Sequence, residues 1–369
     1  MEQEYIVFGD EHYNPLGIVR SLGENGISSI VIVVKSKATV LSSSKYIKKL
    51  YKVDDVLDGY LLLLSLCKSA KTKPFVYTTD DIKTSFLDQK YDELKDVCYF
   101  FNAGANGRIT EFMDKDNINK LAIKYGLNVL PTYRVKKGEI PSDIEYPIIT
   151  KAIASTIGGW KNDVFICHND DELRNAYKTI QSKTVLLQRY IEKKNELCLD
   201  GLVTNKGNEV FVSIASNYNY ILPSQYSSYM TIFNFDDADI QASLNGMMKE
   251  IGFEGIFSAE FLVDQDDKLW FLEINFRNST WSYASTCLGM NLPVLWSQSM
   301  LLGHIPENSI RIIPKGYTAM VEITDFKTRV LGRKIGLLKW LKEFKDTDCL
   351  FYYNKYDKKP FWTTLASKL

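Results

Sequence analysis

The sequence contains few of the residues that build metal centres or disulfide frameworks. Its 369 residues include only three histidines, without metal-ligand spacing, and six dispersed cysteines with no C-x-x-C pair. A zinc site or a disulfide framework is therefore not expected, and a reducing cytoplasm fits best. The cysteines are Cys67, Cys98, Cys167, Cys198, Cys287 and Cys349, and the histidines are His12, His168 and His304.

Net charge and long apolar runs are also missing. Lys plus Arg and Asp plus Glu both total 45, so the formal net charge is zero. This balance argues against a broad electrostatic footprint for nucleic acid or an anionic membrane, but it leaves a local basic pocket open. The most apolar run, residues 60–67, is far shorter than the roughly 20 residues of a membrane-spanning helix. No signal peptide is evident, so we expect a cytoplasmic protein without nucleic-acid or membrane partners.

The first 110 residues predict an open, mostly parallel sheet. Strands and helices alternate in a βαβ order. The expected elements are a strand at 4–9, a loop at 9–17, a short helix at 17–24, a strand at 27–34, a helix at 59–70 and a strand at 74–79. No G-x-G-x-x-G occurs, so an NAD-binding reductase built on this region is not supported.

From residue 114 onward the pattern changes to a helix followed by strands and hairpins. Asp114 or Asp116 can cap the helix, and Gly126 can end it. The expected elements are that helix, strands at 146–154 and 184–191, a loop with two glycines at 155–163, and hairpins at 196–215 and 257–276.

The second hairpin carries a row of polar side chains. Because side chains alternate along a strand, Glu273, Asn275 and Arg277 share one face. The hairpin register places Glu260 across from them, while apolar Leu272 and Ile274 point to the other face. Such oxygen ligands suit a divalent cation such as magnesium. A solvated strand face is the weaker interpretation, because unpaired charges in so apolar a strand would be costly.

Other polar residues are less specific taken singly. Lys151 ends an apolar strand before Gly158 and Gly159, where it could contact phosphates or simply extend from a strand end. Lys115 opens a helix and by itself is typical of a surface residue. The strand end at 188–191 offers backbone groups that can bind adenine, and Glu196 can accept ribose hydroxyls.

In this order, the motifs resemble the ATP-grasp superfamily. The matching segments are MDK…LAIKYGLNVLP at 113–131, YPIITK…GG at 146–159, LLQRYI…E at 186–196, AEFLVD at 259–264 and LEINFR at 272–277. The resemblance implies an α/β (α+β) chain, an ATP-grasp fold preceded by a Rossmann-like βαβ domain. The implied domains are 1–112, 113–310 with a mobile lid in 113–190 and a metal-binding part in 191–310, and a C-terminal extension at 311–369.

The resemblance also implies roles for individual residues. Nucleotide contacts are implied for Lys115, Lys151, Ser155, Gly158, Gly159, Gln188, Arg189, Tyr190, Ile191 and Glu196. Metal ligands are implied in Glu260, Glu273 and Asn275, and a catalytic role in Arg277 and Lys151. Substrate contacts are expected from Asn278, Ser279 and Ser282, although a hydroxyl-rich loop is also an ordinary helix start. Gln188 departs from the family, which usually has Glu there, so the preference for ATP over other nucleotides stays open.

Within the superfamily, the chain looks like the carboxylate–amine ligases, including D-aspartate ligases and carbamoyl-phosphate-synthase-like proteins. The implied reaction activates a small carboxylate as an acyl phosphate with ATP and Mg²⁺, or Mn²⁺, and transfers it to an amine. A bicarbonate-using carboxylase and a catalytically silent ATP-binding regulator are the alternatives. Homodimer formation and the role of residues 311–369, a part of the amine site or a structural extension, are left open.

Overall fold

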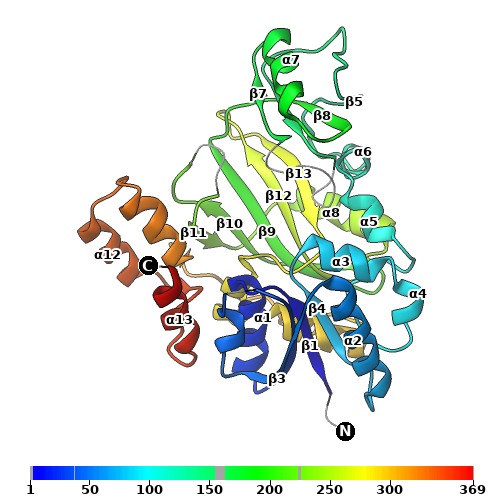
Figure 1. Cartoon of the computed structure of the whole chain (residues 1–369), viewed down its shortest axis with the longest axis vertical. Helices are drawn as coiled ribbons and strands as arrows, with labels where there is room; N and C mark the ends of the chain where they lie inside the picture. The colour runs from blue at the N-terminus through cyan, green and yellow to red at the C-terminus, as the bar shows by residue number, and fades with distance from the viewer. Residues whose placement is uncertain (1–2, 37, 154–162, 223–225, 369) are drawn as a thin grey trace.

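The computed structural model describes residues 3–36, 38–153, 163–222 and 226–368 (Figure 1). Three sheets organise these residues, two of four strands and one of seven. The predicted α/β class with a parallel N-terminal sheet is confirmed. In Figure 1 the N-terminal sheet lies at one end of the molecule, the seven-stranded sheet at the centre and the small sheet at the other end.

The N-terminal sheet is parallel throughout, in the order β3-β2-β1-β4. Its central strand is apolar on both faces, and Ile6, Val7 and Phe8 are fully buried, as expected for a parallel sheet covered by helices. The strands are β1 (Tyr5–Gly9), β2 (Ser29–Val34), β3 (Ile47–Val53) and β4 (Phe75–Thr78). The associated helices are α1 (Tyr13–Glu24), η1 (Leu41–Ser43), α2 (Val56–Ser69), α3 (Asp81–Asp88) and α4 (Tyr91–Leu94).

The first helix begins earlier than the sequence predicted. The prediction placed residues 9–17 in a loop, but α1 begins at Tyr13. The ring of His12 accepts a hydrogen bond from the N–H of Asn14, which caps the helix. Pro15 is compatible with the first helical turn, where its missing N–H would have no partner within the helix. The loop after β1 is therefore short, and α1 starts close to the carboxyl edge of the sheet.

The seven-stranded sheet has the order β13-β12-β9-β10-β11-β14-β15 and is antiparallel except for the β14–β15 pair. Both predicted hairpins, β9–β10 and β12–β13, are confirmed. The strands are β9 (Asn195–Thr204), β10 (Glu209–Tyr218), β11 (Tyr229–Phe233), β12 (Gly255–Val263), β13 (Leu269–Asn275), β14 (Thr318–Met320) and β15 (Cys349–Leu350).

The small sheet has the order β5-β8-β6-β7 and packs against α7 (Asp170–Thr179). Its strands are β5 (Thr132–Lys136), β6 (Ile148–Lys151), β7 (Ile166–Cys167) and β8 (Thr184–Arg189). Strand β6 is shorter than the predicted strand at 146–154. Ser155, Gly158 and Gly159 lie outside the described residues, so the predicted phosphate-covering loop stays a prediction.

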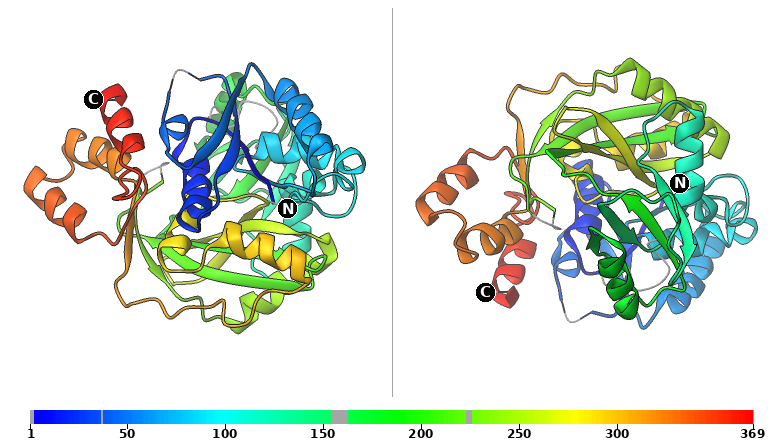
Figure 2. Two further views of the ribbon diagram at one scale, coloured as in Figure 1. Left: turned by 90° about the horizontal axis from the view of Figure 1, so that it is seen from below. Right: turned by 90° about the horizontal axis from the view of Figure 1, so that it is seen from above.

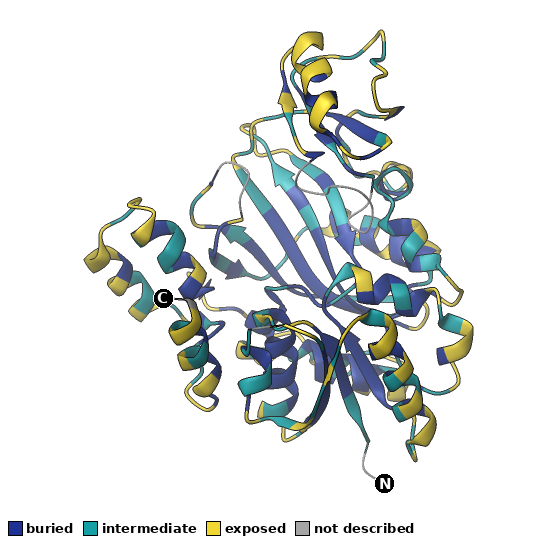
Figure 3. Cartoon of the chain, in the orientation of Figure 1, coloured by how far each residue is buried: buried dark blue, intermediate teal, exposed yellow. Residues whose placement is uncertain are grey.

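One continuous core joins the N-terminal sheet to the seven-stranded sheet. The link is α10 (Leu292–Leu302), whose fully buried Trp296 contacts the rings of Phe75, Tyr77 and Phe101. Figure 3 shows that the strands of both sheets are largely buried. Packing of this kind fixes the carboxyl edge of the N-terminal sheet relative to the β12–β13 hairpin. The remaining helices of this region are α5 (Arg108–Met113), α6 (Lys115–Lys124), α8 (Ala238–Ile251) and α9 (Ser282–Cys287).

The C-terminal segment is fastened to the N-terminal region by a buried arginine. Arg20 of α1 donates to the backbone oxygens of Phe351 and Tyr352 at 2.8 Å each and pairs with Asp357 at 3.1 Å. Because Arg20 is fully buried, losing these partners would leave an uncompensated charge. These contacts give the C-terminal segment a structural role. Its helices are α11 (Glu322–Asp325), η3 (Phe326–Leu331), α12 (Leu337–Asp346) and α13 (Lys359–Lys368).

The domain boundaries at 112/113, 190/191 and 310/311 stay predictions. Among the described residues, no helix has both the length and the apolar character needed to cross a membrane.

Candidate active site

The β12–β13 hairpin brings the predicted metal ligands together. Glu260 pairs directly with Glu273, and Ser258 pairs with Asn275, which confirms the expected register. The register shifts after Glu260, so Leu272 has no partner on β12. Such a bulge re-aims neighbouring side chains, and it lies next to the two facing carboxylates.

Direct hydrogen bonds connect this row to helix α6. The Nδ2 of Asn275 donates to Oε1 of Glu260 at 2.9 Å, and Nζ of Lys115 lies 2.6 Å from Oε2 of Glu273. Lys115 is the first residue of α6, whose cap is Asp114, one of the two caps that the sequence predicted. Because Asp114 fixes where α6 begins, it also places Lys115 within reach of Glu273. The structure thus brings together Lys115 and the hairpin, which are 158 residues apart in the chain.

The two facing carboxylates differ in their pKa. Burial, followed by the nearby charges of Glu273 and Glu196, raises the pKa of Glu260 to about 8. The ammonium of Lys115 lowers the pKa of Glu273 and keeps that carboxylate ionised. Burial by itself would lower the pKa of Lys115, but the charge and hydrogen bond of Glu273 more than offset this effect, so the pKa is raised. Glu273 therefore carries a settled negative charge, whereas among the described residues no ion pair is formed by Glu260.

Arg277 meets an acidic residue of the N-terminal region that the sequence reasoning missed. Its Nε lies 2.8 Å from Oδ1 of Asp81, the first residue of α3, and its Nη2 donates to Oδ1 of Asn275 at 3.0 Å. A usable signal existed, because residues 80–81 directly follow the strand predicted at 74–79. Polar residues at the carboxyl ends of parallel strands are where α/β sheets bind ligands.

A recess opens where these elements meet. Its lining residues are Asp81, Phe112, Met113, Lys115, Ile118, Glu273, Ile274 and Asn275. It combines the acidic row with apolar walls from α5 and α6. Among the described residues, no three His, Cys, Asp or Glu side chains are placed to hold a metal by themselves. A metal bound here would need further ligands from substrate phosphates or water, as magnesium usually does.

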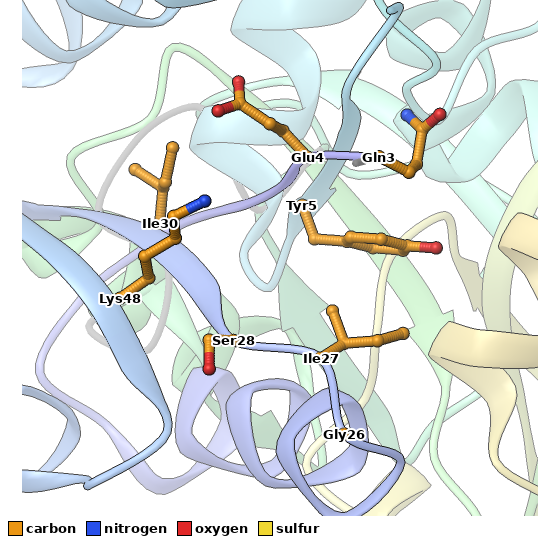
Figure 4. Close-up of a pocket in the computed structure, with 8 residues that line it drawn as sticks. All are labelled: Gln3, Glu4, Tyr5, Gly26, Ile27, Ser28, Ile30 and Lys48. Atoms are coloured by element: carbon orange, nitrogen blue, oxygen red, sulfur yellow. The ribbon is translucent and has the colours of Figure 1, made fainter. Parts of the chain in front are cut away.

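A second hollow lies away from this site. Figure 4 shows it beside Tyr5, Ile27 and Lys48, at the amino ends of β1 and β2. Ligands of open α/β sheets bind outside the carboxyl ends of the strands. The hollow at the opposite edge is therefore not the candidate active site.

Lys151 and Gln188, each with a predicted nucleotide contact, meet on the small sheet. Nζ of Lys151 donates to Oε1 of Gln188 at 2.7 Å, and Nε2 of Gln188 donates to Oγ1 of Thr132 at 3.0 Å. Burial, followed by the charge of Lys115, lowers the pKa of Lys151 to about 8. A neutral glutamine gives Lys151 a hydrogen bond without a counter-charge, whereas the family's usual glutamate would pair with the ammonium.

The strand end after Gln188 retains a free backbone donor. The N–H groups of Arg189 and Tyr190 donate to the oxygens of Pro131 and Pro147, at 2.9 and 2.8 Å. Among the described residues, the N–H of Ile191 has no hydrogen-bond partner, so it is available to a ligand. The side chain of Arg189 pairs with Glu145 at 2.7 Å on the exposed surface. Any nucleotide contact by Arg189 would therefore come from its backbone.

Glu196 lies on β9, beside the hairpin, and pairs with Lys193 at 2.6 Å. Both side chains are largely buried, at 15% and 22% exposed. A carboxylate already held by an ammonium can still accept hydroxyl hydrogen bonds through its other oxygen. Its predicted ribose contact stays a prediction.

The expected substrate residues are turned toward buried partners. Ser279 and Ser282 both donate to the fully buried Asp200, Ser282 at 2.8 Å. Asn278 donates through Nδ2 to Oδ1 of Asn14 at 2.7 Å. These bonds hold the segment after β13 against β9 and α1. Substrate contact by these side chains stays a prediction, and Asp200 is a residue that sequence reasoning missed.

The family model of the carbamoyl-phosphate synthase L chain, ATP binding domain, matches residues 114–295. This segment contains the hairpin, Lys115, Lys151 and the strand end at Gln188. The chain has the ATP-grasp fold, and its residues 114–295, just under half of the chain, match this family. The family accounts for the order in which these residues occur along the sequence.

Curated relatives of this ATP-grasp chain are distant. N5-carboxyaminoimidazole ribonucleotide synthase of Staphylococcus aureus is 24% identical over 209 residues, which cover 53% of this chain and 53% of that protein. The mitochondrial propionyl-CoA carboxylase alpha chain of Caenorhabditis briggsae is 24% identical over 197 residues, covering 47% of this chain and 26% of that protein. The chain therefore spans about half the length of the first relative and about a quarter of the second.

Two solved structures share the fold over most of the chain. N5-carboxyaminoimidazole synthetase from Staphylococcus aureus aligns with a TM-score of 0.64 and 15% identity, covering 90% of this chain and 88% of that one. The L-amino acid ligase from Bacillus licheniformis aligns with a TM-score of 0.63 and 13% identity, covering 82% and 75%. At these identities the alignments establish the ATP-grasp fold, and they leave the substrate undetermined.

Proposed function

We propose that this chain is an ADP-forming ligase that activates a carboxylate with ATP and magnesium and joins it to an amine. One observation carries the proposal. Glu260, Glu273 and Asn275 gather on one hairpin, and the cations Lys115 and Arg277 contact that row directly. Facing carboxylates beside fixed cations are suited to a metal-bound polyphosphate, whose negative charge the cations would share.

The donor set fits magnesium. Two carboxylates and an amide oxygen are hard ligands, and two carboxylates plus phosphates form a usual magnesium environment. The raised pKa of Glu260 reflects burial and then repulsion from Glu273 and Glu196, which the charges of Arg277 and Lys115 offset only in part. A divalent ion bound between Glu260 and Glu273 would remove that repulsion. When bound, it would neutralise phosphate charge and hold the phosphates in one orientation.

The nucleotide would lie between the small sheet and the hairpin. Lys151 reaches this side from β6, Lys115 from α6, and the free N–H of Ile191 offers an adenine contact at the end of β8. The two lysines would bind phosphate oxygens as point charges. Binding would redirect Lys115 from Glu273 toward the phosphates, and it would favour the charged form of Lys151.

Chemistry would proceed in two steps. A substrate carboxylate attacks the γ-phosphorus of ATP in line, which forms an acyl phosphate and releases ADP. The amine then attacks the acyl carbon, an amide bond forms, and phosphate leaves with the bonding electrons. Arg277 would stabilise the transferred phosphoryl group, and Asp81 would hold the guanidinium in place through its Nε. The protein thus contributes positioning and fixed charge, without forming a covalent bond to the substrate.

An assay of nucleotide turnover tests the proposal. Purified protein would be incubated with ATP, magnesium and pools of amino acids and small carboxylates, and ADP and phosphate would be measured. We expect release that depends on both a carboxylate and an amine and that Glu273→Ala abolishes. Absence of ADP with every pool would contradict the ligase. Turnover that persists in Glu273→Ala would contradict the assigned metal site.

A bicarbonate-using enzyme is the second candidate, because one curated relative is a carboxylase by name and the other is the synthase of a carboxyamino compound. The same assay separates the two candidates. Phosphate release that requires bicarbonate, with no other carboxylate present, would favour the carboxylase.

A further inference from the structure

The C-terminal helix α12 presents an apolar surface that the fold does not cover. Leu338 is 84% exposed, Leu337 50% and Leu341 46%, and Leu331 at the end of η3 is 58% exposed. Single exposed leucines are ordinary, but four close in sequence on one helix and the turn before it are not. Figure 3 shows exposed residues along the outer part of this helix.

A concentration of positive charge surrounds these leucines. Residues 326–346 contain seven Lys or Arg and two acidic residues, a net charge of +5 in a chain whose total is zero. Five of these cations are exposed, and none has an ion-pair partner among the described residues. They are Arg333, Lys334, Lys339, Lys342 and Lys345. Zero net charge over the whole chain led the sequence reasoning to expect no membrane contact, whereas this segment carries a local excess of positive charge.

The inner side of α12 is firmly attached, so its outer side is a stable surface. Trp340 is buried and donates through Nε1 to Oδ2 of Asp325 at 2.9 Å. Arg329, also buried, bridges Asp325 and Glu343 at 3.3 and 2.6 Å. These contacts fix the rotation of the helix about its axis. The leucines therefore face outward because of the packing, and their exposure is not a sign of a loose helix.

The position of α12 in the molecule favours a flat surface as its partner over a peptide that binds in a groove. Figures 1 and 2 show α12 at the outer edge of the C-terminal segment, projecting away from the sheets in each view. A convex, protruding helix can touch a plane without a clash from the rest of the protein. A second copy is disfavoured, because a two-fold contact would place the same five cations against each other.

We propose that α12 docks on an anionic membrane surface, with its exposed leucines entering the headgroup boundary and its cations contacting lipid phosphates. A helix with an apolar strip and flanking lysines binds lipid interfaces in this way, lying in the plane of the surface. Lysine side chains can keep their ammonium groups at headgroup level while their stems follow the leucines inward. Acidic lipids would supply the negative charge that the exposed lysines and arginine of this segment do not find among the described residues of the chain.

Vesicle co-sedimentation of the full chain, without nucleotide, tests the proposal independently of the ligase activity. Vesicles of phosphatidylcholine alone would be compared with vesicles that also contain phosphatidylglycerol. We expect binding to the anionic vesicles that weakens as salt is added, because the charge interaction is screened. The double variant Lys339→Gln/Lys342→Gln should lower the partition coefficient roughly thirtyfold, and Leu338→Ser/Leu341→Ser by about tenfold or more.

Helix α2 offers matched controls far from α12. Leu57 and Leu61 are 52% and 55% exposed there, and Lys68 and Lys71 lie at and just beyond its end. Leu57→Ser/Leu61→Ser and Lys68→Gln/Lys71→Gln change polarity and charge by the same amount and should leave binding unchanged. Since all substituted side chains are exposed, thermal unfolding should confirm that every variant is folded.

Three outcomes would overturn the proposal. The first is no binding to anionic vesicles by the parent chain. The second is equal loss of binding in the α12 variants and the α2 controls. The third is a concentration-dependent dimer, seen by sedimentation velocity without lipid, that Leu338→Ser/Leu341→Ser dissociates. This last result would assign the surface to a second copy.

Discussion

Protonation of Glu260 should control how tightly the site binds magnesium with ATP. Burial and two neighbouring carboxylates raise the pKa of this group to about 8. Metal binding requires the charged form and therefore releases a proton. At pH 7 only about one molecule in ten carries that charge before binding, and at pH 6 about one in a hundred. Affinity should rise about tenfold per pH unit until about pH 8 and then level off.

Lys151 should impose the opposite trend at higher pH. Its pKa is lowered to about 8, first by burial and then by the charge of Lys115. Above that pH the free protein progressively loses a cation that would contact phosphate, so affinity should decline. The two groups together predict a maximum near pH 8. Glu260→Gln should remove the rise on the acid side, and Lys151→Arg should remove the decline on the alkaline side, because arginine stays charged.

Isothermal titration calorimetry with a non-hydrolysable ATP analogue and magnesium measures the affinity and the proton release. Titrations between about pH 6 and pH 9, in two buffers of different ionisation enthalpy, give the affinity and the number of protons released. Nearly one proton should be released at pH 7 in the parent chain and none in Glu260→Gln. An affinity that stays constant between about pH 6 and pH 8 would refute the reasoning. So would an acid-side rise that survives in Glu260→Gln.

Three further predictions concern residues that hold the site and the fold. Asp81→Asn should lower kcat about tenfold or more while KM for ATP changes little, because the group that lies 2.8 Å from Nε of Arg277 loses its negative charge. A mainly raised KM in steady-state assays would contradict this role. Burial raises the pKa of Glu322 to about 7, so the folded state binds the extra proton and stability should fall by about 3 kcal/mol from pH 4.5 to above pH 7. Urea unfolding measured across this pH range should show that the free energy of unfolding depends less on pH in Glu322→Gln than in the parent chain. An unchanged pH dependence would contradict the role of Glu322. Gly201→Ala should cost about 3 kcal/mol or more in the same assay, since a Cβ there would lie 2.1 Å from the Phe211 oxygen, whereas Gly336→Ala, with open space around it, should be neutral.

The sequence determined the local features of the site, because they depend on short-range rules. Alternation along a strand placed Glu273 and Asn275 on one face, and the hairpin register placed Glu260 opposite Glu273. A cap at Asp114 or Asp116 was predicted from their positions at the start of the helical pattern, and the structure places it at Asp114. Even so, the start of α1 was placed four residues late, since a histidine is an uncommon cap.

Only the tertiary structure decided what meets these residues. Nothing local in the sequence pairs Arg277 with Asp81, which is 196 residues away, because that contact depends on how α10 joins two sheets. The differing pKa values of Glu260 and Glu273 also depend on distance and burial, which no pattern encodes. The same holds for α12: its composition was visible in the sequence, but the packing of Trp340 and Arg329 decides which side faces outward. Order along the chain thus predicted the candidate ligands, and packing between distant segments set their charges, their partners and the surfaces left exposed.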